Sequence, residues 1–271
     1  MIQIARDLLT DALGEAGSET FEDTEDGIKG YVQESLFDEN AMNDVISNFM
    51  LPDVTINANI QEAEYKNWNE EWEEAGFERI NINDSITIYD ARHDDGNGIA
   101  SGISIGIETK QAFGTGTHET TRMIVSTLLN IDLKGKRVLD CGCGTGILGI
   151  AASKLGASEV VGYDIDEWSS ENAIHNAELN GVGNMKVMLG DASVLKSVEG
   201  KFDVVLANIN RNILLADMPA FVSVMADDSL LILSGFYASD VDLLIEKASS
   251  LGLSKIDTKS DSEWTCLVLK K

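Results

Sequence analysis

The sequence predicts an α/β protein: a mostly parallel β-sheet that ends in an antiparallel hairpin, preceded by a small α+β unit. Three observations support this prediction. From Thr117 onward, short apolar runs rich in Val, Ile and Leu alternate with helical patterns, which is typical of parallel strands joined by covering helices. The chain ends in two β-rich runs in succession. Its first 60 residues follow a different order, α-β-β-α-β.

The N-terminal unit is predicted over residues 1–60. Apolar residues with helical spacing indicate the helices, and β-rich runs around a TEDG turn indicate a hairpin. In order, the predicted elements are a helix at 2–16, strands at 18–23 and 28–33, a helix at 38–50 capped near Asp38 or Asn40, and a strand at 54–63. A ferredoxin-like domain has one more strand in front, so either the N-terminus is incomplete or that strand lies within residues assigned to the first helix.

Residues 61–90 are predicted to link this unit to the larger domain. The linker is acidic, and Trp68 and Trp72 are spaced i, i+4, which places both rings on one helix face. We expect the rings to pack the linker onto a domain, with a partner-binding face as the alternative. The β-rich runs at 79–90 and 100–108 lead into the loop QAFGTGTHETT, Gln111 to Thr121.

The larger domain is predicted over residues 91–271, with strands and helices alternating from residue 118. Thr117 is the expected N-cap of its first helix. The predicted elements are helices at 118–130, 145–156, 169–181, 213–225 and 239–252, strands at 137–142, 159–166, 186–191, 202–209 and 229–236, and a hairpin at 253–271.

The charge of the chain is concentrated in its first third. The net charge is −26, and residues 1–90 hold 22 acidic and four basic residues, a net of −18. Such a surface repels nucleic acid and attracts a basic partner, although an acidic surface also serves solubility alone. The sequence therefore disfavours direct nucleic-acid binding.

The cysteines and the hydropathy pattern indicate whether to expect disulfides, a metal site or a membrane span. Cys141, Cys143 and Cys266 give no disulfide framework, and a lone C-x-C without a second ligand pair is weak evidence for zinc. We expect no metal site. The sequence contains no run of 18 apolar residues, and therefore no pattern that predicts a membrane span. We therefore expect a reduced, cytoplasmic protein, and favour a monomer.

A glycine cluster follows the strand predicted at 137–142. Gly142, Gly144 and Gly146 allow the backbone to turn sharply and to approach a ligand closely, and the next helix begins there with free N–H groups. Asp164 ends the next strand and could accept both hydroxyls of a ribose. Asp191, after the third strand, could accept from an adenine amino group. Together these residues predict a site for an adenosine-bearing ligand.

Two classes of ligand are compatible with this pattern. GTGILG, Gly144 to Gly149, matches the dinucleotide pattern G-x-G-x-x-G. However, the sheet ends in a hairpin rather than in a second mononucleotide-binding half. Asp140, one residue inside its strand end, suits a cation, and Asn208 ends the fourth strand with a polar side chain at the reacting end. S-adenosylmethionine, which carries a positive sulfur and no phosphate, fits better, and a methyltransferase is therefore favoured over a dehydrogenase.

Several motifs of this chain resemble the bacterial methyltransferases that modify ribosomal large-subunit protein eleven, the PrmA family. They are AFGTGTHETT, VLDCGCGTGILGIAA, GYDID, VLANI and the linker NWNEEWE. The resemblance implies a class I methyltransferase (Rossmann-like) catalytic domain, a ferredoxin-like domain that binds the protein substrate, and methylation of lysine side chains and an N-terminal amine. By matching motif, it assigns cofactor contacts to Thr121, Gly142, Asp164 and Asn208. Its substrate, a ribosomal protein, is expected to be basic and to be steered by the acidic unit.

The residues agree with an aliphatic amine as acceptor. Asn208 and nearby carbonyls could orient the amine, and NIN, Asn208 to Asn210, lacks the N-P-P-[YF] motif of enzymes that act on planar amides and base amines. His118 is the nearest candidate base, although a histidine in a first helical turn is more often a surface or packing residue. Another protein lysine, a small-molecule amine and a non-catalytic cofactor-binding module remain as alternatives.

Overall fold

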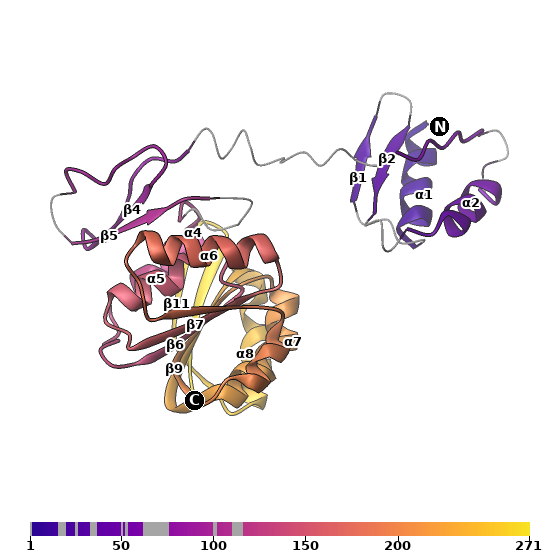
Figure 1. Ribbon diagram of the computed structural model, residues 1–271. Coiled ribbons are helices and arrows are strands. Elements are labelled where there is room, and N and C mark those ends of the chain that lie inside the picture. Colours follow the sequence, from indigo (N-terminus) through magenta and orange to yellow (C-terminus); the bar gives the residue numbers. More distant parts are fainter. Residues whose placement is uncertain are drawn as a thin grey trace. The chain divides into compact units, whose positions relative to one another are not determined.

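The computed structural model describes residues 2–15, 20–24, 27–32, 37–49, 51, 54–61, 76–99, 102–109 and 116–271. The chain divides into two compact units, Met1–Tyr65 and Lys66–Lys271, and Figure 1 draws the elements of each. No helix in the described part of the chain is long and apolar enough to cross a membrane.

The first unit contains two helices and one hairpin. Its elements are α1 (Ile2–Glu15), β1 (Thr20–Asp23), β2 (Ile28–Tyr31) and α2 (Glu39–Ser47). β1 and β2 pair antiparallel, and α1 contacts both α2 and β2. Asp38 caps α2 by accepting from the backbone N–H groups of Asn40 and Ala41. The order α-β-β-α therefore agrees with the sequence pattern.

The strand predicted at 54–63 is wrong over the residues that the structure describes. Residues 54–61 form no strand, most of their side chains are exposed, and the sheet of this unit has two strands. Alternating polarity favours a strand only where a neighbouring edge can take up its backbone hydrogen bonds. Because residues 2–15 are helical, they do not supply the missing strand either, and a ferredoxin-like arrangement is not confirmed. Trp68 and Trp72 lie outside the described residues.

The second unit is built on a seven-stranded sheet in the order β11-β12-β10-β9-β6-β7-β8. The strands from β10 to β8 are parallel, and the hairpin β11–β12 joins β10 antiparallel, which confirms the predicted sheet. The bounds are β6 (Arg137–Cys141), β7 (Glu159–Asp164), β8 (Met185–Leu189), β9 (Phe202–Asn208), β10 (Met225–Tyr237), β11 (Ser254–Asp261) and β12 (Trp264–Lys270).

Helices cover both faces of this sheet. α4 (Glu119–Leu128), α5 (Ile147–Lys154) and α6 (Glu167–Leu179) contribute to one apolar core, and α7 (Arg211–Val224) and α8 (Val241–Ser250) to the other. Successive strand residues alternate between the two cores, as Val138 and Leu139 do. Strands that are apolar on both faces are expected in a parallel sheet covered on both sides. Short 3-10 turns, η2 (Ala192–Ser197) and η3 (Ala238–Asp240), complete the unit.

A second, three-stranded sheet packs on the first core. It contains β3 (Ile80–Ile82), β4 (Ile86–Asp90) and β5 (Ile103–Ile107), with β3–β4 antiparallel and β4–β5 parallel. β3 contacts α4, while β5 contacts α5 and α6. The second half of the predicted 61–90 linker therefore carries two strands of the larger unit.

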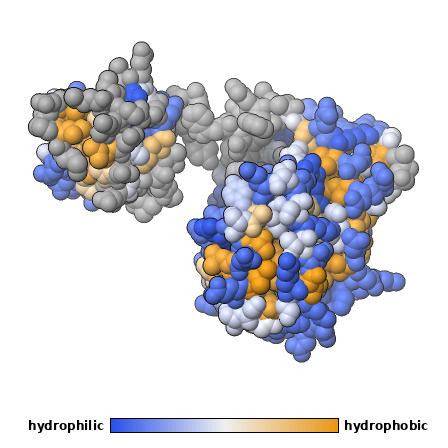
Figure 2. Space-filling model, turned by 180° about the vertical axis from the view of Figure 1, so that it is seen from behind, coloured by the Kyte–Doolittle hydropathy of each residue, from blue (hydrophilic) through white to orange (hydrophobic). Residues whose placement is uncertain are grey.

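The surface of the larger unit carries apolar residues among hydrophilic ones, as the face drawn in Figure 2 shows. Its exposed large apolar side chains include Ile165, Trp168 and Leu189, at or just beyond the carboxyl ends of β7 and β8. Single exposed apolar residues are common on protein surfaces, but Ile165 and Leu189 lie beside the candidate site.

Candidate active site

The glycine loop lies at the carboxyl end of β6, an interior strand of the sheet between β9 and β7. Gly142, Gly144 and Gly146 have φ angles of 65°, 52° and 81°, in the left-handed region that favours glycine. Gly146 is also the N-cap of α5, and a Cβ atom there would lie 3.1 Å from the Cβ atom of Ala173. The glycines are therefore required both by backbone conformation and, at Gly146, by close packing.

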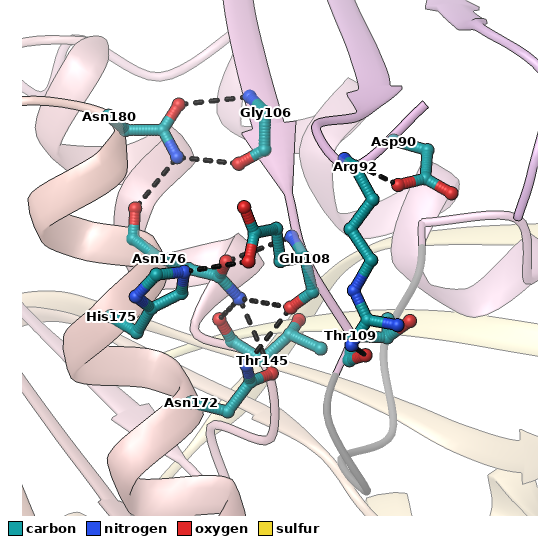
Figure 3. Close-up of polar contacts among 10 residues, drawn as sticks. All are labelled: Asp90, Arg92, Gly106, Glu108, Thr109, Thr145, Asn172, His175, Asn176 and Asn180. Atoms are coloured by element: carbon teal, nitrogen blue, oxygen red, sulfur yellow. Dashed lines mark hydrogen bonds and ion pairs between the residues drawn. The ribbon is translucent and has the colours of Figure 1, made fainter. Parts of the chain in front are cut away.

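Hydrogen bonds within the loop and to its neighbours, among them one of 3.0 Å from the Cys143 N–H to the Tyr163 carbonyl, fix the shape of this loop. The backbone N–H of Gly144 donates to Oδ2 of Asp164 at 2.9 Å, and that of Gly146 donates to the carbonyl of Cys143 at 2.8 Å. The carbonyl of Thr145 accepts from Nδ2 of Asn176 on α6 at 3.0 Å, as Figure 3 shows. The loop is therefore held from β7 and from α6 as well as by its own turn.

Asp164 and Asp191 lie at the ends of neighbouring strands. Asp164 is the last residue of β7, and its Oδ1 accepts from the backbone N–H of Asp166 at 3.1 Å. Asp191 follows β8, is exposed, and caps η2 by accepting from the backbone N–H of Ser193 at 2.8 Å. Hydrogen bonds from Ser193, chiefly from its side chain, lower the pKa of Asp191. Carboxylate oxygens retain further acceptor capacity, so both can take hydroxyl or amino donors of a nucleoside.

Ile165 is a candidate ligand contact that the sequence prediction missed. Its side chain is 71% exposed, directly after Asp164, and Leu189, paired with Asp164 across β7 and β8, is 54% exposed. Exposed apolar side chains between two carboxylates suit a flat base whose edge is polar and whose faces are not. The signal was present in the sequence as an apolar residue immediately after the strand-end acid.

Asp140 is fully buried beneath the glycine loop. Its Oδ2 accepts from the backbone N–H of Gly149, in the first turn of α5, at 2.8 Å. Its Oδ1 has no hydrogen-bond partner among the described residues. The pKa of this carboxyl is raised to about 7, chiefly by burial and also by the nearby Asp164, against the opposing effect of the Gly149 hydrogen bond. A buried acceptor without a partner beside a nucleoside-binding loop fits a cationic ligand such as S-adenosylmethionine.

Strand β9 and helix α4 bring Asn208 and Thr121 together. Asn208 is the last residue of β9, and its Nδ2 lies 3.4 Å from Oγ1 of Thr121 in α4. Thr121 is 2% exposed, so its hydroxyl is well placed to orient the amide. Residues 111–115 of the preceding loop lie outside the described residues.

His118, not Thr117, is the N-cap of α4. Its Nδ1 accepts from the backbone N–H of Thr120 at 3.3 Å and lies 2.9 Å from the hydroxyl of the same residue. Its ring packs edge-on against Trp264, with the ring centroids 4.8 Å apart. The prediction that Thr117 caps the helix was therefore one residue early, because the imidazole nitrogen takes the position of a capping oxygen. These contacts give His118 a structural role.

An aromatic cavity of about 320 Å³ lies next to Asn208 along the chain. The rings of Tyr237 and Trp264, 4.6 Å apart, form part of its wall. Its lining residues are Asn210, Arg211, Asn212, Gly235, Phe236, Tyr237, Asp240 and Trp264. Because Ser234 in β10 pairs with Asn208 in β9, the cavity opens at the same carboxyl edge as the glycine loop. The sequence prediction missed this cavity, since Trp264 belongs to the terminal hairpin.

The predicted absence of a metal site has not been tested, because only part of the chain is described. Within that part, no group of three His, Cys, Asp or Glu side chains is arranged to hold a metal ion. Cys141 and Cys143 are buried, and burial raises the pKa of both thiols. Buried neutral thiols are poor metal ligands.

Comparison with known proteins connects this geometry to a family. The model of the ribosomal protein L11 methyltransferase (PrmA) family matches residues 7–271. A ribosomal protein L11 methyltransferase from Phocaeicola vulgatus is 46% identical over 98% of this chain and 93% of its own length. One from Bacteroides fragilis is 43% identical over 98% of this chain and 94% of its own.

Solved structures agree in fold. The ribosomal protein L11 methylase of Lactobacillus delbrueckii subsp. bulgaricus is 29% identical with a TM-score of 0.63, covering 71% of this chain and 98% of its own. A methyltransferase from Streptococcus mutans described as SAM-dependent, 16% identical with a TM-score of 0.52, covers 61% of this chain and 54% of its own and shows the fold alone. This chain thus belongs to the ribosomal protein L11 methyltransferase (PrmA) family, and its cofactor is S-adenosylmethionine.

Proposed function

We propose that this protein methylates ribosomal protein L11 and that the accepting groups are amines, lysine side chains among them. Relatives that carry the name ribosomal protein L11 methyltransferase are 41–46% identical over 98% of this chain. One structural observation supports the choice of an amine. Asn208 lies between a loop suited to a nucleoside and an aromatic cavity, all at one edge of the sheet.

The cofactor end of this edge consists of the glycine loop, Asp164 and Asp191. We assign Asp164 to the ribose hydroxyls and Asp191 to the adenine amino group, because carboxylates on neighbouring strand ends accept such donors. Gly142, Gly144 and Gly146 allow the ligand to approach the backbone. Bound S-adenosylmethionine supplies a methyl group on a positively charged sulfur, which a neutral amine can accept.

The acceptor end must orient an amine that has lost its proton. With a reference pKa near 10.4, deprotonating a lysine at pH 7 costs about 4–5 kcal/mol. Contact with the rings of Tyr237 and Trp264 would remove part of the water around the amine, which favours its neutral form. Because Nδ2 of Asn208 donates to Thr121, the Oδ1 atom of the amide is left to accept an N–H of the substrate. Asn208 is therefore the proposed orienting residue.

The acidic unit accounts for the choice of a protein substrate. We propose that residues 1–60 recognise the substrate, that 61–90 connect them to the rest, and that 91–271 bind the cofactor and catalyse transfer. The net charge of −18 over residues 1–90 would steer a basic ribosomal protein and repel nucleic acid. A cytoplasmic monomer is part of this proposal.

Transfer of a labelled methyl group tests the proposal directly. The full chain is incubated with methyl-labelled S-adenosylmethionine and purified ribosomal proteins, and hydrolysates are searched for methylated lysine. We expect label in L11 alone, and a KM for L11 that rises with salt concentration because steering by the acidic unit is screened. Label only in small molecules would contradict the proposal. So would bound cofactor without transfer to any protein.

The Trp264→Ala variant separates the two ends of the site. It removes a wall of the aromatic cavity but no residue assigned to the cofactor. We expect the KM for L11 to rise, on the order of tenfold, while the affinity for the cofactor changes little. An equal loss of cofactor affinity would place Trp264 at the cofactor end instead.

A further inference from the structure

Three asparagines, two on α6 and one at its C-cap, hold the edge of β5 and of Glu108, the residue after it. Figure 3 shows Asn172, Asn176 and Asn180 along the helix, facing the β5 backbone. Asn180 accepts from the N–H of Gly106 at 3.0 Å and donates to its carbonyl at 2.6 Å. Asn176 accepts from the N–H of Glu108 at 2.9 Å and donates to its carbonyl at 3.0 Å. Asn172 donates to the same carbonyl at 3.0 Å.

The spacing of these residues explains why amides on a helix can replace a neighbouring strand. Four residues of helix rise about 6 Å, and two residues of strand rise about 6.6 Å. Asn176 therefore lies opposite Glu108, and Asn180 lies opposite Gly106. Each side-chain amide offers one donor and one acceptor to the facing backbone, as a residue of a neighbouring strand would. β4 occupies the opposite edge of β5. The segment is thus held on both sides up to Thr109, whose carbonyl also accepts from Arg92.

Asn176 differs from Asn180 because it also reaches the glycine loop. Its Nδ2 donates to the carbonyl of Thr145 at 3.0 Å, and the residue is fully buried. Thr145 stands between Gly144 and Gly146, both at positive φ. Glycine loses more conformational freedom on ordering than any other residue. A fixed carbonyl between two glycines therefore limits the loop more than the same bond would in a stiffer segment.

We propose that Asn176 is a positioning residue for cofactor binding. By joining the Thr145 carbonyl to the backbone of Glu108, it holds the glycine loop in its binding conformation before the cofactor arrives. Ordering a loop in advance raises affinity, because the cost of ordering it is no longer met on binding. This inference rests on the proposed function only in that the loop 142–146 binds the cofactor.

Asn180 provides a matched control on the same helix face. Asn176→Leu and Asn180→Leu each replace an amide by an apolar group of similar size, and each removes hydrogen bonds to β5. Only Asn176→Leu also removes the hydrogen bond to the Thr145 carbonyl. A purely structural role for the asparagines predicts a loss of affinity that follows the loss of Tm in each variant, whereas a positioning role predicts a selective loss of cofactor binding in Asn176→Leu.

The experiment measures S-adenosylhomocysteine affinity by calorimetry and thermal stability for the full-length chain and both variants. We expect Tm to fall in both variants, further in Asn176→Leu because Asn176 is buried and Asn180 is half-buried. Beyond this difference, we expect affinity to be reduced on the order of tenfold more in Asn176→Leu than in Asn180→Leu. Equal losses of affinity, or a loss that follows Tm alone, would overturn the proposal. A wild-type chain that binds the ligand but methylates no protein would count against the proposed function and not against this inference.

Amide hydrogen exchange supplies a second readout that does not depend on activity. In the ligand-free chain, we expect the backbone amides of residues 144–146 to exchange several-fold faster in Asn176→Leu than in Asn180→Leu, and ligand to restore their protection. If Asn176→Leu does not fold, the smaller Asn176→Ala is compared with Asn180→Ala in the same way. Unchanged exchange in the Asn176 variant would overturn the proposal.

Discussion

The two ends of the carboxyl edge of the sheet are built from different interactions. At the cofactor end, Asp140 and Asp164 accept backbone N–H groups of the glycine loop and of α5, and the loop itself is bonded at several points. At the acceptor end, Asn208 makes one 3.4 Å contact with Thr121, and the cavity wall combines packed rings with the ion pair of Arg211 and Asp240. One end is fixed by carboxylates bonded to the backbone, while the other combines neutral rings and amides with one ion pair.

This difference indicates how each end works. A cofactor that is the same in every turnover favours a rigid site with preset charges. A protein substrate that presents an amine favours rings that pack against its side chain and a single amide that sets direction. We therefore expect changes at the cofactor end to alter affinity and stability strongly, and changes in the ring contacts of the acceptor end to have smaller effects.

The largest expected effect concerns Asp140 and the pH dependence of stability. The pKa of this carboxyl is raised, chiefly by burial, to about 7, above its value in the unfolded chain. The protonated form is therefore favoured in the folded state, and the stability that it contributes is lost as pH rises from about 4 through 7. Denaturant unfolding without cofactor should show wild type losing up to about 4 kcal/mol relative to Asp140→Asn over this range.

The Asp140→Asn variant is a close control because its side-chain carbonyl can still accept from Gly149. The groups that face Asp140 are the Gly149 amide, the carboxylate of Asp164, the thiols of Cys141 and Cys143 and the hydroxyl of Tyr163. Both chains carry all of them. A difference in stability between the two chains that does not vary with pH would contradict the raised pKa. Added S-adenosylmethionine should reduce the loss in wild type if its charge lies near this carboxylate.

The second-largest expected effect is a loss of cofactor affinity on changing Asp164, which we assign to the ribose. Asp164→Ala removes the acceptor for both hydroxyls and the partner of the Gly144 amide. Hydrogen bonds to a charged group contribute about 1.5–3 kcal/mol, so we expect cofactor affinity to fall on the order of 100-fold. Calorimetry with S-adenosylhomocysteine measures this loss.

A charge-matched control lies two residues away. Asp166→Asn removes the same charge but keeps an oxygen that can cap α6, where Asp166 accepts from Ser169. We expect its affinity to stay within about threefold of wild type. A similar loss in both variants would show that net charge, and not the position of Asp164, determines binding.

Much of the fold followed from the sequence because the strands of the main sheet are apolar on both faces. Runs such as VVLAN and LLILS predict buried strands whatever their partners are, and the terminal hairpin was visible as two β-rich runs. The strand predicted at 54–63 failed because alternation does not specify a partner edge. The sheet β3-β4-β5 was visible only as β-rich segments, since pairing between distant residues leaves no local pattern.

Some residues of the candidate site could likewise be predicted from the sequence, and others could not. Gly142, Gly146 and Asp164 were predictable because backbone conformation and strand ends demand particular residue types. Asn176 and Trp264 were not, because their roles depend on segments far apart in the sequence: Asn176 meets Thr145 across 31 residues, and Trp264 meets His118 through the terminal hairpin. The i, i+4 spacing of the asparagines is visible in the sequence, but the backbone segments to which they bond are not.

The smallest expected effect, at the acceptor end, concerns His118. As the N-cap of α4, it should contribute about 1 kcal/mol to stability, which His118→Ala would lose. His118→Asn should restore most of that loss, because asparagine is a good N-cap. A general base contributes about 100-fold or more to turnover, so kcat and its pH profile separate the two roles. We expect kcat of both variants to stay within about twofold of wild type. A large loss of kcat in His118→Asn, with stability intact, would show that the ring takes a proton and that the acceptor end is less neutral than its contacts indicate.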